Sequence, residues 1–224
     1  MTNTGSGLIF PQVLFDYEHF AHKALFEGVG YVWEVLTRLE AYIAACVGGP
    51  CQPRVTIMPG AIVSPDVVFG VDVVVEPHAY IKGPAIIGDR TVIRHCAYIR
   101  ENVVVGNDCV IGNATEIKHS ILMDRGRASH WNYIGDSIVG FGVNLGAGVK
   151  LSNRKITDSE VIVRDIDEKT YGTGLRKLGG IIGDQTQIGC NAVLNPGALL
   201  GKRCLVYPLA SVRGTYQHDQ LIRS

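Results

Sequence analysis

The sequence predicts an all-β solenoid, in which one short strand forms in every six residues. Large apolar residues recur at this interval over eleven successive positions from Ile57 to Ile117, and the register returns between Ile182 and Val212. The residue four places after each of them is small or β-branched in nearly every case, so it points to the same side of a strand as the next large residue. Three such faces make one coil, and stacked coils bury a continuous core. The repeat length predicts about six to seven coils.

The composition is typical of a compact β-rich protein. Of the 224 residues, 46% are hydrophobic, 27 are glycine and only 19% are charged. Lysine plus arginine balances aspartate plus glutamate at 21 each, so no net field attracts nucleic acid or an anionic membrane. Neither a run of 18 apolar residues nor a signal-peptide pattern at the N-terminus is present. We therefore expect a cytoplasmic protein without nucleic-acid or membrane partners.

The period of six divides the chain into three parts. Residues 1–52 lack it and are predicted to form an N-terminal helical arm, which ends at a breaker cluster at 48–53. The solenoid domain covers residues 53–213 and is interrupted by a loop at 154–178, an excursion of a length that is usually functional or disordered. The polar tail at 214–224 is expected to shield the open end from edge pairing. Helical spacing in the arm is seen for Leu25, Val29, Val32, Leu36, Leu39 and Ile43.

The six cysteines do not indicate a disulfide framework. Cys109 and Cys204 occupy small inward positions of the repeat, where reduced cysteine is common. Cys46 and Cys51 flank the breaker cluster, and this pair is too small to form a metal site alone.

Residues 18 apart lie one above another, separated by roughly the 4.8 Å strand spacing. Lys82, Arg100 and Lys118 form such a column. Like charges stacked this closely destabilise a sheet unless an anion or carboxylates neutralise them. The alternative interpretation is that the three side chains form a solvated surface stripe and bind no ligand. After Lys118 the repeat loses register, because the next clear anchor after Met123 is eleven residues later. His130 lies inside this interruption of the repeat. Because functional residues are often found where a chain departs from its own sequence pattern, His130 is the candidate general base.

Several motifs between Arg100 and Asn153 carry a resemblance to a known family. They are Glu116-Ile-Lys118, Ala128-Ser-His130-Trp-Asn-Tyr133-Ile-Gly-Asp136 and Val143-Asn144-Leu-Gly-Ala-Gly148. This stretch closely resembles the acetyltransferase half of bacterial bifunctional N-acetylglucosamine-1-phosphate uridyltransferases. The end of the loop, from Tyr171 to Gly183, looks more like the archaeal sugar-phosphate nucleotidyltransferases with the same C-terminal helix. The resemblance implies a left-handed β-helix over about residues 54–213.

The resemblance also implies an activity, which is transfer of acetyl from acetyl-CoA to the amine of a hexosamine 1-phosphate, most readily glucosamine 1-phosphate. His130 would be the general base, since an imidazole changes charge in the required range. Arg100 would bind the anomeric phosphate bidentately, and Lys118 would add a point charge. No metal is required by this direct transfer. The lysine-containing, glycine-rich signature of a nucleotidyltransferase domain is not found in the chain, so we expect no nucleotide-sugar synthesis.

The remaining site residues are implied by the resemblance alone. Tyr133 and Asn144 would hold the phosphate or sugar hydroxyls, and Asn153 would orient the amine or the acetyl group. A homotrimer is expected, with Lys177 reaching a neighbouring subunit's sugar site. Coenzyme A would lie between adjacent coils of two subunits, near Ala147 and Cys190. The bacterial family commonly has serine where this chain has Cys190, and its basic C-terminal segment is not evident here.

Three alternatives stay open. The same kind of helix builds gamma-class carbonic anhydrases, which bind zinc through histidines of two subunits; His78, His95 and His119 suggest this, but the close histidine pair five residues apart is absent. A non-catalytic scaffold that binds a sugar phosphate is a second possibility. The third is an acyltransferase for another amino sugar, such as a galactosamine phosphate or a nucleotide-linked sugar, because stereochemistry at one hydroxyl depends on fine side-chain placement.

Overall fold

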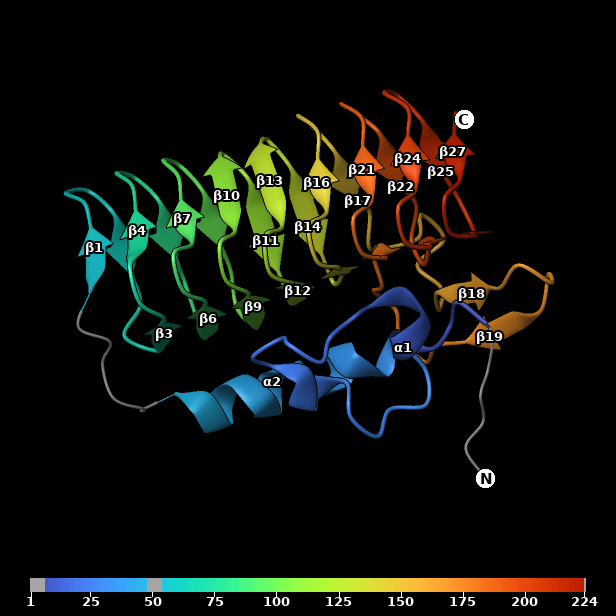
Figure 1. Cartoon of the computed structure of the whole chain (residues 1–224), viewed down its shortest axis with the longest axis horizontal. Coiled ribbons are helices and arrows are strands. Elements are labelled where there is room, and N and C mark those ends of the chain that lie inside the picture. The colour runs from blue at the N-terminus through green and yellow to red at the C-terminus, as the bar shows by residue number, and fades with distance from the viewer. Residues whose placement is uncertain (1–6, 48–53, 224) are drawn as a thin grey trace.

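The computed structural model describes residues 7–47 and 54–223, and its main body is a left-handed parallel β-helix (Figure 1). Each coil contributes one strand to each of three parallel sheets, and strands of successive coils pair in register, as Tyr80 does with Tyr98. The alternation of inward apolar and outward polar residues within two- to four-residue strands explains this arrangement. The predicted fold class is therefore confirmed.

In the described residues, the strands of the three parallel sheets follow one another in this order. The first sheet has nine, in the order β1 (Val55–Ile57), β4 (Val73–Val75), β7 (Val92–Ile93), β10 (Val110–Asn113), β13 (Arg127–His130), β16 (Asn144–Leu145), β21 (Gln187–Ile188), β24 (Leu205–Val206) and β27 (Leu221–Ile222). The second has eight: β2 (Ile62–Val63), β5 (Tyr80–Ile81), β8 (Tyr98–Ile99), β11 (Glu116–Lys118), β14 (Tyr133–Gly135), β17 (Lys150–Leu151), β22 (Val193–Leu194) and β25 (Ser211–Val212). The third also has eight: β3 (Val67–Phe69), β6 (Ala85–Ile87), β9 (Val103–Val105), β12 (Ser120–Leu122), β15 (Ile138–Val139), β20 (Ile181–Ile182), β23 (Leu199–Leu200) and β26 (Thr215–Tyr216).

The estimate of six to seven coils was too low. Residues 54–223 form eight complete coils and begin a ninth. One reason is that the segment after Val212 continues the helix: β26 pairs with β23, and β27 pairs with β24. Residues in this segment were expected to shield the open end, and they instead add strands to it. Ile222 is buried in the same core as the earlier anchors.

The loss of register begins directly after Lys118, as the sequence suggested, but it is confined to the turn there and does not extend to His130. Leu122 and Ala128 are both fully buried in the core, so the anchors continue through the stretch after Met123. What changes is the coil length. Ser120 pairs with Val103, and Tyr133 pairs with Glu116, in each case 17 residues apart rather than the 18 between Tyr80 and Tyr98. The missing residue falls in the turn between the second and third sheets.

The arm is only partly helical and covers one face of the β-helix. Its elements are α1 (Pro11–Leu14), the 3-10 helix η1 (Lys23–Leu25) and α2 (Glu34–Cys46). Glu34 stabilises the start of α2, because its carboxylate accepts the backbone N–H groups of Gly30 (2.7 Å) and Tyr31 (3.1 Å). The apolar side of α2 lies along the outer face of the third sheet (Figure 1), in a cluster with Ile86, Val104 and Ile121. The predicted breaker cluster at 48–53 lies outside the described residues.

The interrupting loop forms an antiparallel hairpin of β18 (Ile162–Arg164) and β19 (Thr170–Gly172). Its Tyr171 ring packs against Tyr31 and Trp33 of the arm, with ring centroids 5.5 and 6.3 Å apart. Arm and hairpin thus form one apolar layer on the third sheet. No helix in the described part of the chain is both long and apolar enough to cross a bilayer.

Candidate functional site

Each coil turns at three corners, and these position the polar side chains. The first corner leads from the first sheet to the second, the second corner from the second sheet to the third, and the third corner from the third sheet back to the first. Cys109 and Cys204 are buried and free near the start of the first-sheet strands, as expected. The predicted site residues lie at the first and second corners and on the strands beside them.

At the second corner, three side chains form a buried polar group. Lys118 Nζ lies 2.9 Å from Asp136 Oδ2, and the amide of Asn153 donates to the same carboxylate oxygen. The Lys118 and Asp136 side chains are only 13% and 8% exposed. A buried charge pair of this kind holds both side chains in fixed positions, because separation would leave either charge desolvated. We call Lys118, Asp136 and Asn153 the second-corner group.

Asp136 is buried in the second of two shortened turns. His119 and Asp136 adopt left-handed backbone conformations with φ of +43° and +46°. The Asp136 N–H donates to the carbonyl of Lys118 (3.1 Å), which holds the two successive short turns together. The register places Asp136 at the turn position of His119, one coil later. Lys118 and Asn153 hold its carboxylate there.

Tyr133 extends along the second sheet toward this group. A Cβ atom at Gly135 would lie 2.8 Å from the Tyr133 hydroxyl and 2.7 Å from Asn153 Nδ2, so only glycine leaves room for both side chains. Burial raises the pKa of Tyr133, and the negative charges of Glu116 and Asp136 add to this effect. The phenol is therefore a neutral hydrogen-bonding group beside the buried ammonium.

The stacked cations are present as predicted, but carboxylates of the same chain face all three. Arg100 Nη1 donates to Glu116 Oε1 (3.0 Å), a hydrogen bond that raises the guanidinium pKa further. Lys82 lies 3.3 Å from Glu101. Lys82 is 46% exposed and fits the solvated-stripe alternative, whereas Lys118 does not. Together with Glu116, Glu101 and Asp136, the cation column has no net charge.

These three carboxylates were not singled out from the sequence. Each follows a column cation by about one coil: Glu101 after Lys82, Glu116 after Arg100 and Asp136 after Lys118. A search of the repeat for acidic residues 16 to 19 positions after a cation would have found them. The motifs quoted for the resemblance already contained Glu116 and Asp136 without giving them a role.

At the first corner, His130 lies in one column with the two expected coenzyme contacts. The register of β13, β16 and β21 places Ala147 one coil beyond His130, and Cys190 one coil beyond Ala147. Backbone hydrogen bonds link the turns, from Gly148 N–H to the His130 carbonyl (2.9 Å) and from Asn191 N–H to the Ala147 carbonyl (2.8 Å). His130 is exposed, so it lies outside the buried anchors as expected.

A groove on the outer side of the first sheet contains two of the predicted residues. Asn144, on β16, and Cys190 line it together with apolar side chains of the next coils, among them Leu205 and Tyr207. Its volume is about 490 Å³. The groove opens next to the column of His130, Ala147 and Cys190. A long, partly apolar molecule lying there would have one end beside the His130 corner.

The loop returns to the helix beside the second-corner group. Leu178 N–H donates to the Asn153 carbonyl (2.9 Å), and Gly179 N–H donates to the Asp136 carbonyl (2.7 Å). Lys177 directly precedes these two residues and is exposed. Its backbone therefore lies next to the second-corner group of its own chain. The second sheet, with Tyr133 three residues after His130, joins the two corners.

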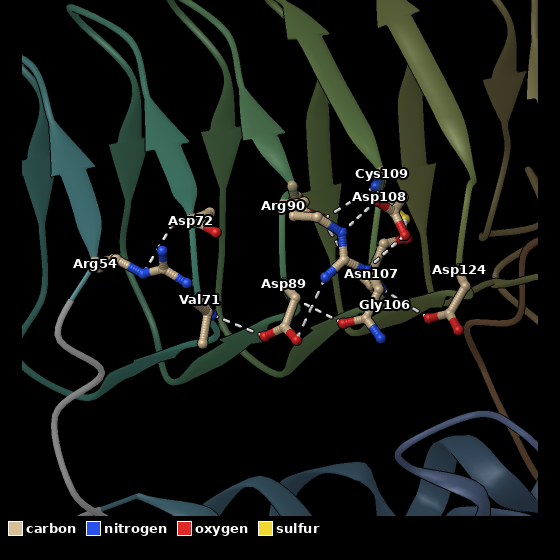
Figure 2. A network of polar contacts seen from close by, with 11 residues as sticks. Arg54, Val71, Asp72, Asp89, Arg90, Gly106, Asn107, Asp108, Cys109 and Asp124 are labelled. Atoms are coloured by element: carbon tan, nitrogen blue, oxygen red, sulfur yellow. Dashed lines mark hydrogen bonds and ion pairs between the residues drawn. The ribbon is translucent and has the colours of Figure 1, made fainter.

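The third corner also carries columns of polar residues, and these form a ladder within the protein (Figure 2). Asp89 accepts the N–H of Val71, Asn107 accepts that of Asp89, and Asp124 accepts that of Asn107, at 2.7 to 2.8 Å. Each side chain thus satisfies a backbone donor of the preceding coil. Beside the ladder, paired residues lie on the surface, such as Arg90 with Asp108 (2.7 Å).

The histidines of the carbonic anhydrase alternative are divided between two corners. His78 and His95 lie in first-corner turns, and His119 lies in a second-corner turn. Across residues 7–47 and 54–223, no three His, Cys, Asp or Glu side chains gather in a way that would hold a metal ion.

Comparison with known proteins gives relatives for the β-helix. A family described as the GMPPB C-terminal domain matches residues 81–167, a range that includes both corners of the site. A bifunctional sugar-1-phosphate nucleotidylyltransferase/acetyltransferase of Sulfurisphaera tokodaii is 35% identical over 43% of this chain and 24% of its own length. Bifunctional protein GlmU of Methanococcus maripaludis is 33% identical over 47% of this chain and 27% of its own length. A putative acetyltransferase of Escherichia coli, YaiX, is 32% identical over 48% of this chain and 49% of its own.

The chain therefore spans about a quarter of the length of the first two relatives. The expected resemblance to sugar-1-phosphate nucleotidyltransferase/acetyltransferase proteins is confirmed. Solved structures with a similar fold include a UDP-N-acetylglucosamine acyltransferase from Campylobacter jejuni, with 18% identity, a TM-score of 0.45 and coverage of 75% of this chain and 68% of that one. Another is a GDP-perosamine N-acetyltransferase from Caulobacter crescentus, with 17% identity, a TM-score of 0.32 and coverage of 74% and 51%. These homologues and neighbours are acyltransferases of the hexapeptide-repeat type.

Proposed function

We propose that this chain transfers the acetyl group of acetyl-CoA to the amine of an amino sugar that carries a phosphate on its anomeric carbon. The smallest such acceptor is a hexosamine 1-phosphate, with glucosamine 1-phosphate first among them. The observation that carries this proposal is the buried second-corner group, joined by Tyr133 to the corner that carries His130. It lies within residues 81–167, which match the family described as the GMPPB C-terminal domain. A bifunctional sugar-1-phosphate nucleotidylyltransferase/acetyltransferase is among the relatives of the chain.

The second corner supplies fixed donors for the phosphate. Arg100 has a planar guanidinium that binds a phosphate bidentately, and Lys118 adds an ammonium one coil away. Tyr133 and Asn153, in the next two coils after Lys118, provide neutral donors. Because carboxylates already hold the cations in place, little side-chain entropy is lost when a ligand arrives. We assign the phosphate and the adjacent sugar hydroxyls to these four residues.

His130 would act as the base of the transfer. The sugar amine attacks the thioester carbonyl carbon, so that a C–N bond forms and the C–S bond breaks. The imidazole of His130 takes the proton that the amine loses, and the coenzyme leaves as a thiolate that is then protonated. His130 is exposed at the corner and free to meet a bound amine. The step uses only the amine, the thioester and the imidazole, and we propose that it needs no metal.

The groove on the first sheet is the proposed site of the coenzyme. It contains Asn144 and Cys190, and it is mostly apolar, as suits the long pantetheine arm. We propose a homotrimer in which a neighbouring copy covers this groove and in which Lys177 contributes to a sugar site. The exposed position of Lys177 beside Asn153 supports such a contribution without deciding which copy's site it serves.

The test is release of free thiol from acetyl-CoA by the purified full chain. Glucosamine 1-phosphate, galactosamine 1-phosphate and free glucosamine serve as acceptors, with and without a chelator. We expect turnover of at least one phosphorylated amino sugar, slower turnover of the free sugar and no effect of the chelator. Binding of the sugar phosphates without any turnover would favour the scaffold alternative. A strict requirement for magnesium or zinc would contradict the proposed mechanism.

A further inference from the structure

Two tyrosines extend the outer face of the second sheet beyond the proposed phosphate site. Tyr80 on β5 and Tyr98 on β8 are register partners, and their rings are stacked with centroids 5.3 Å apart and planes 12° apart. Tyr80 is 42% exposed. The guanidinium of Arg100 lies 6.0 Å from the centre of the Tyr98 ring. An exposed aromatic platform therefore adjoins the column of cations.

The cation column is longer than one phosphate requires. Lys82 follows Tyr80 by two residues, and Arg100 follows Tyr98 by two, so tyrosine and cation share the outer side of each strand end. From Lys82 to Lys118 the column spans two strand spacings, or about 10 Å. Exposure rises along it, from 13% for Lys118 through 31% for Arg100 to 46% for Lys82. The accessible end of the column is thus the end beside the tyrosines.

The charge balance of the column also favours a ligand larger than a sugar monophosphate. Each cation faces Glu101, Glu116 or Asp136, so a small dianion gains little from net charge. Base stacking on aromatic rings supplies binding free energy that does not depend on net charge. The exposed Tyr80, which is supported by Tyr98, provides such a surface two residues before Lys82.

We propose that the preferred acceptor is a nucleotide-linked amino sugar, in which a diphosphate joins the sugar to a nucleoside. The second phosphate would lie between Arg100 and Lys82. The base would stack on the face of Tyr80 that is turned away from Tyr98, because the Tyr98 ring already lies between Tyr80 and Arg100. From Tyr133 on β14 to Tyr80 on β5 there are three strand spacings, about 14 Å, which is more than a hexosamine 1-phosphate spans. This proposal rests on the proposed function and names the acceptor class of the same site.

The first experiment measures binding of uridine diphosphate by calorimetry, without any acetyl donor. The full chain is first saturated with coenzyme A, so that the probe does not occupy the coenzyme groove. Tyr80→Ala and Tyr98→Ala are expected to weaken binding roughly 5- to 100-fold, the range for loss of one stacked base. Tyr80→Phe and Tyr98→Phe keep the rings and are expected to bind as the wild type does. Absence of binding, or equal binding by the alanine variants, would overturn the proposal.

The second experiment compares two acceptors in the thiol-release assay. Lys82→Ala is expected to raise the KM for uridine diphosphate glucosamine about tenfold, the effect of one charge-assisted hydrogen bond. The KM for glucosamine 1-phosphate should stay unchanged, since Lys82 faces only the second phosphate. Equal effects on both acceptors would contradict the second-phosphate site. If no amino sugar is acetylated, the proposed function fails, whereas acetylation of glucosamine 1-phosphate without uridine diphosphate binding defeats this inference alone.

Discussion

The second and third corners of the β-helix both carry columns of charged residues, but they differ in what those residues satisfy. At the third corner, Asp89, Asn107 and Asp124 accept backbone N–H groups of the preceding coil, and the coils keep their regular length through Asp89 and Asn107 (Figure 2). At the second corner, Lys118 and Asp136 are buried against each other in two shortened turns. A column of polar residues alone therefore does not indicate a ligand-binding site. A column of polar residues at an interruption of the repeat does indicate one.

The same comparison extends to the loop. It leaves the helix at the second corner, directly after Asn153, and it returns there through hydrogen bonds to the carbonyls of Asn153 and Asp136. Three successive turns at this corner thus depart from the repeat, two by shortening and one by insertion. Each departure either carries or supports a residue of the second-corner group. The polar residues of the third corner stabilise the fold, and we assign ligand binding to those of the second corner.

The largest effect is expected for His130→Ala. Loss of a general base lowers kcat roughly 100- to 10,000-fold. His95→Ala is the matched control, because His95 occupies the same first-corner position two coils earlier and is also exposed. Thiol-release kinetics and size-exclusion chromatography check both variants. A loss of assembly in His130→Ala, or an equal loss of activity in His95→Ala, would show a structural role instead.

Next in size is the effect of Lys118→Ala on stability. The variant leaves the Asp136 carboxylate buried with only Asn153 as a side-chain partner, which is expected to lower the free energy of unfolding by about 3 kcal/mol. Arg90→Ala removes an exposed ion pair at the third corner, where a much smaller loss is expected because water screens the two charges. Urea denaturation measures both changes. Equal losses would mean that the two corners do not differ in the way described.

A smaller effect is expected for Gly135→Ala. The added methyl group would displace Tyr133 and Asn153, and we expect the KM for the sugar phosphate to rise about tenfold, as for loss of one or two hydrogen bonds. The KM for acetyl-CoA should change little, because the groove lies at the first sheet. Gly30→Ala, in the arm, meets only the flexible Glu34 side chain and is the control. An unchanged KM for the sugar phosphate would remove Tyr133 and Asn153 from the site.

The smallest effect is expected for Asp124→Asn, which changes the stability of the third-corner ladder in a pH-dependent way. Burial raises the pKa of the Asp124 carboxyl group in the folded protein. Ionised Asp124 therefore lowers the free energy of unfolding, and this loss disappears as the pH falls through the folded pKa toward the unfolded one. Asn107 fills the same role in the ladder as a neutral amide. Asp124→Asn is therefore expected to raise the free energy of unfolding at pH 7 by no more than about 1 kcal/mol, and the gain should vanish near pH 3. Urea titrations at the two pH values test this, and destabilisation at pH 7 would contradict it.

The repeat made the fold predictable, because an inward apolar residue every six positions is compatible with few other structures. It also placed Lys82, Arg100 and Lys118 in one column correctly. Three features depended on information beyond the period. The sequence places the loss of register after Lys118 but does not show that a single turn carries it, since Leu122 and Ala128 are acceptable inward residues in either register. Nor does it show that carboxylates neutralise the column, or that α2 and the hairpin meet on the third sheet, because these contacts join residues far apart in sequence.

The most direct test applies one substitution to both corners. Asp136→Asn and Asp124→Asn each replace a carboxylate by an amide of the same shape, and kcat/KM for acetyl transfer to glucosamine 1-phosphate is measured for both. The uncharged amide leaves the largely buried Lys118 ammonium without its counter-ion, so Asp136→Asn is expected to displace Lys118 and to lower kcat/KM at least tenfold. Asp124→Asn should leave it unchanged. Equal activities of the two variants would contradict the assignment of the second corner as the site.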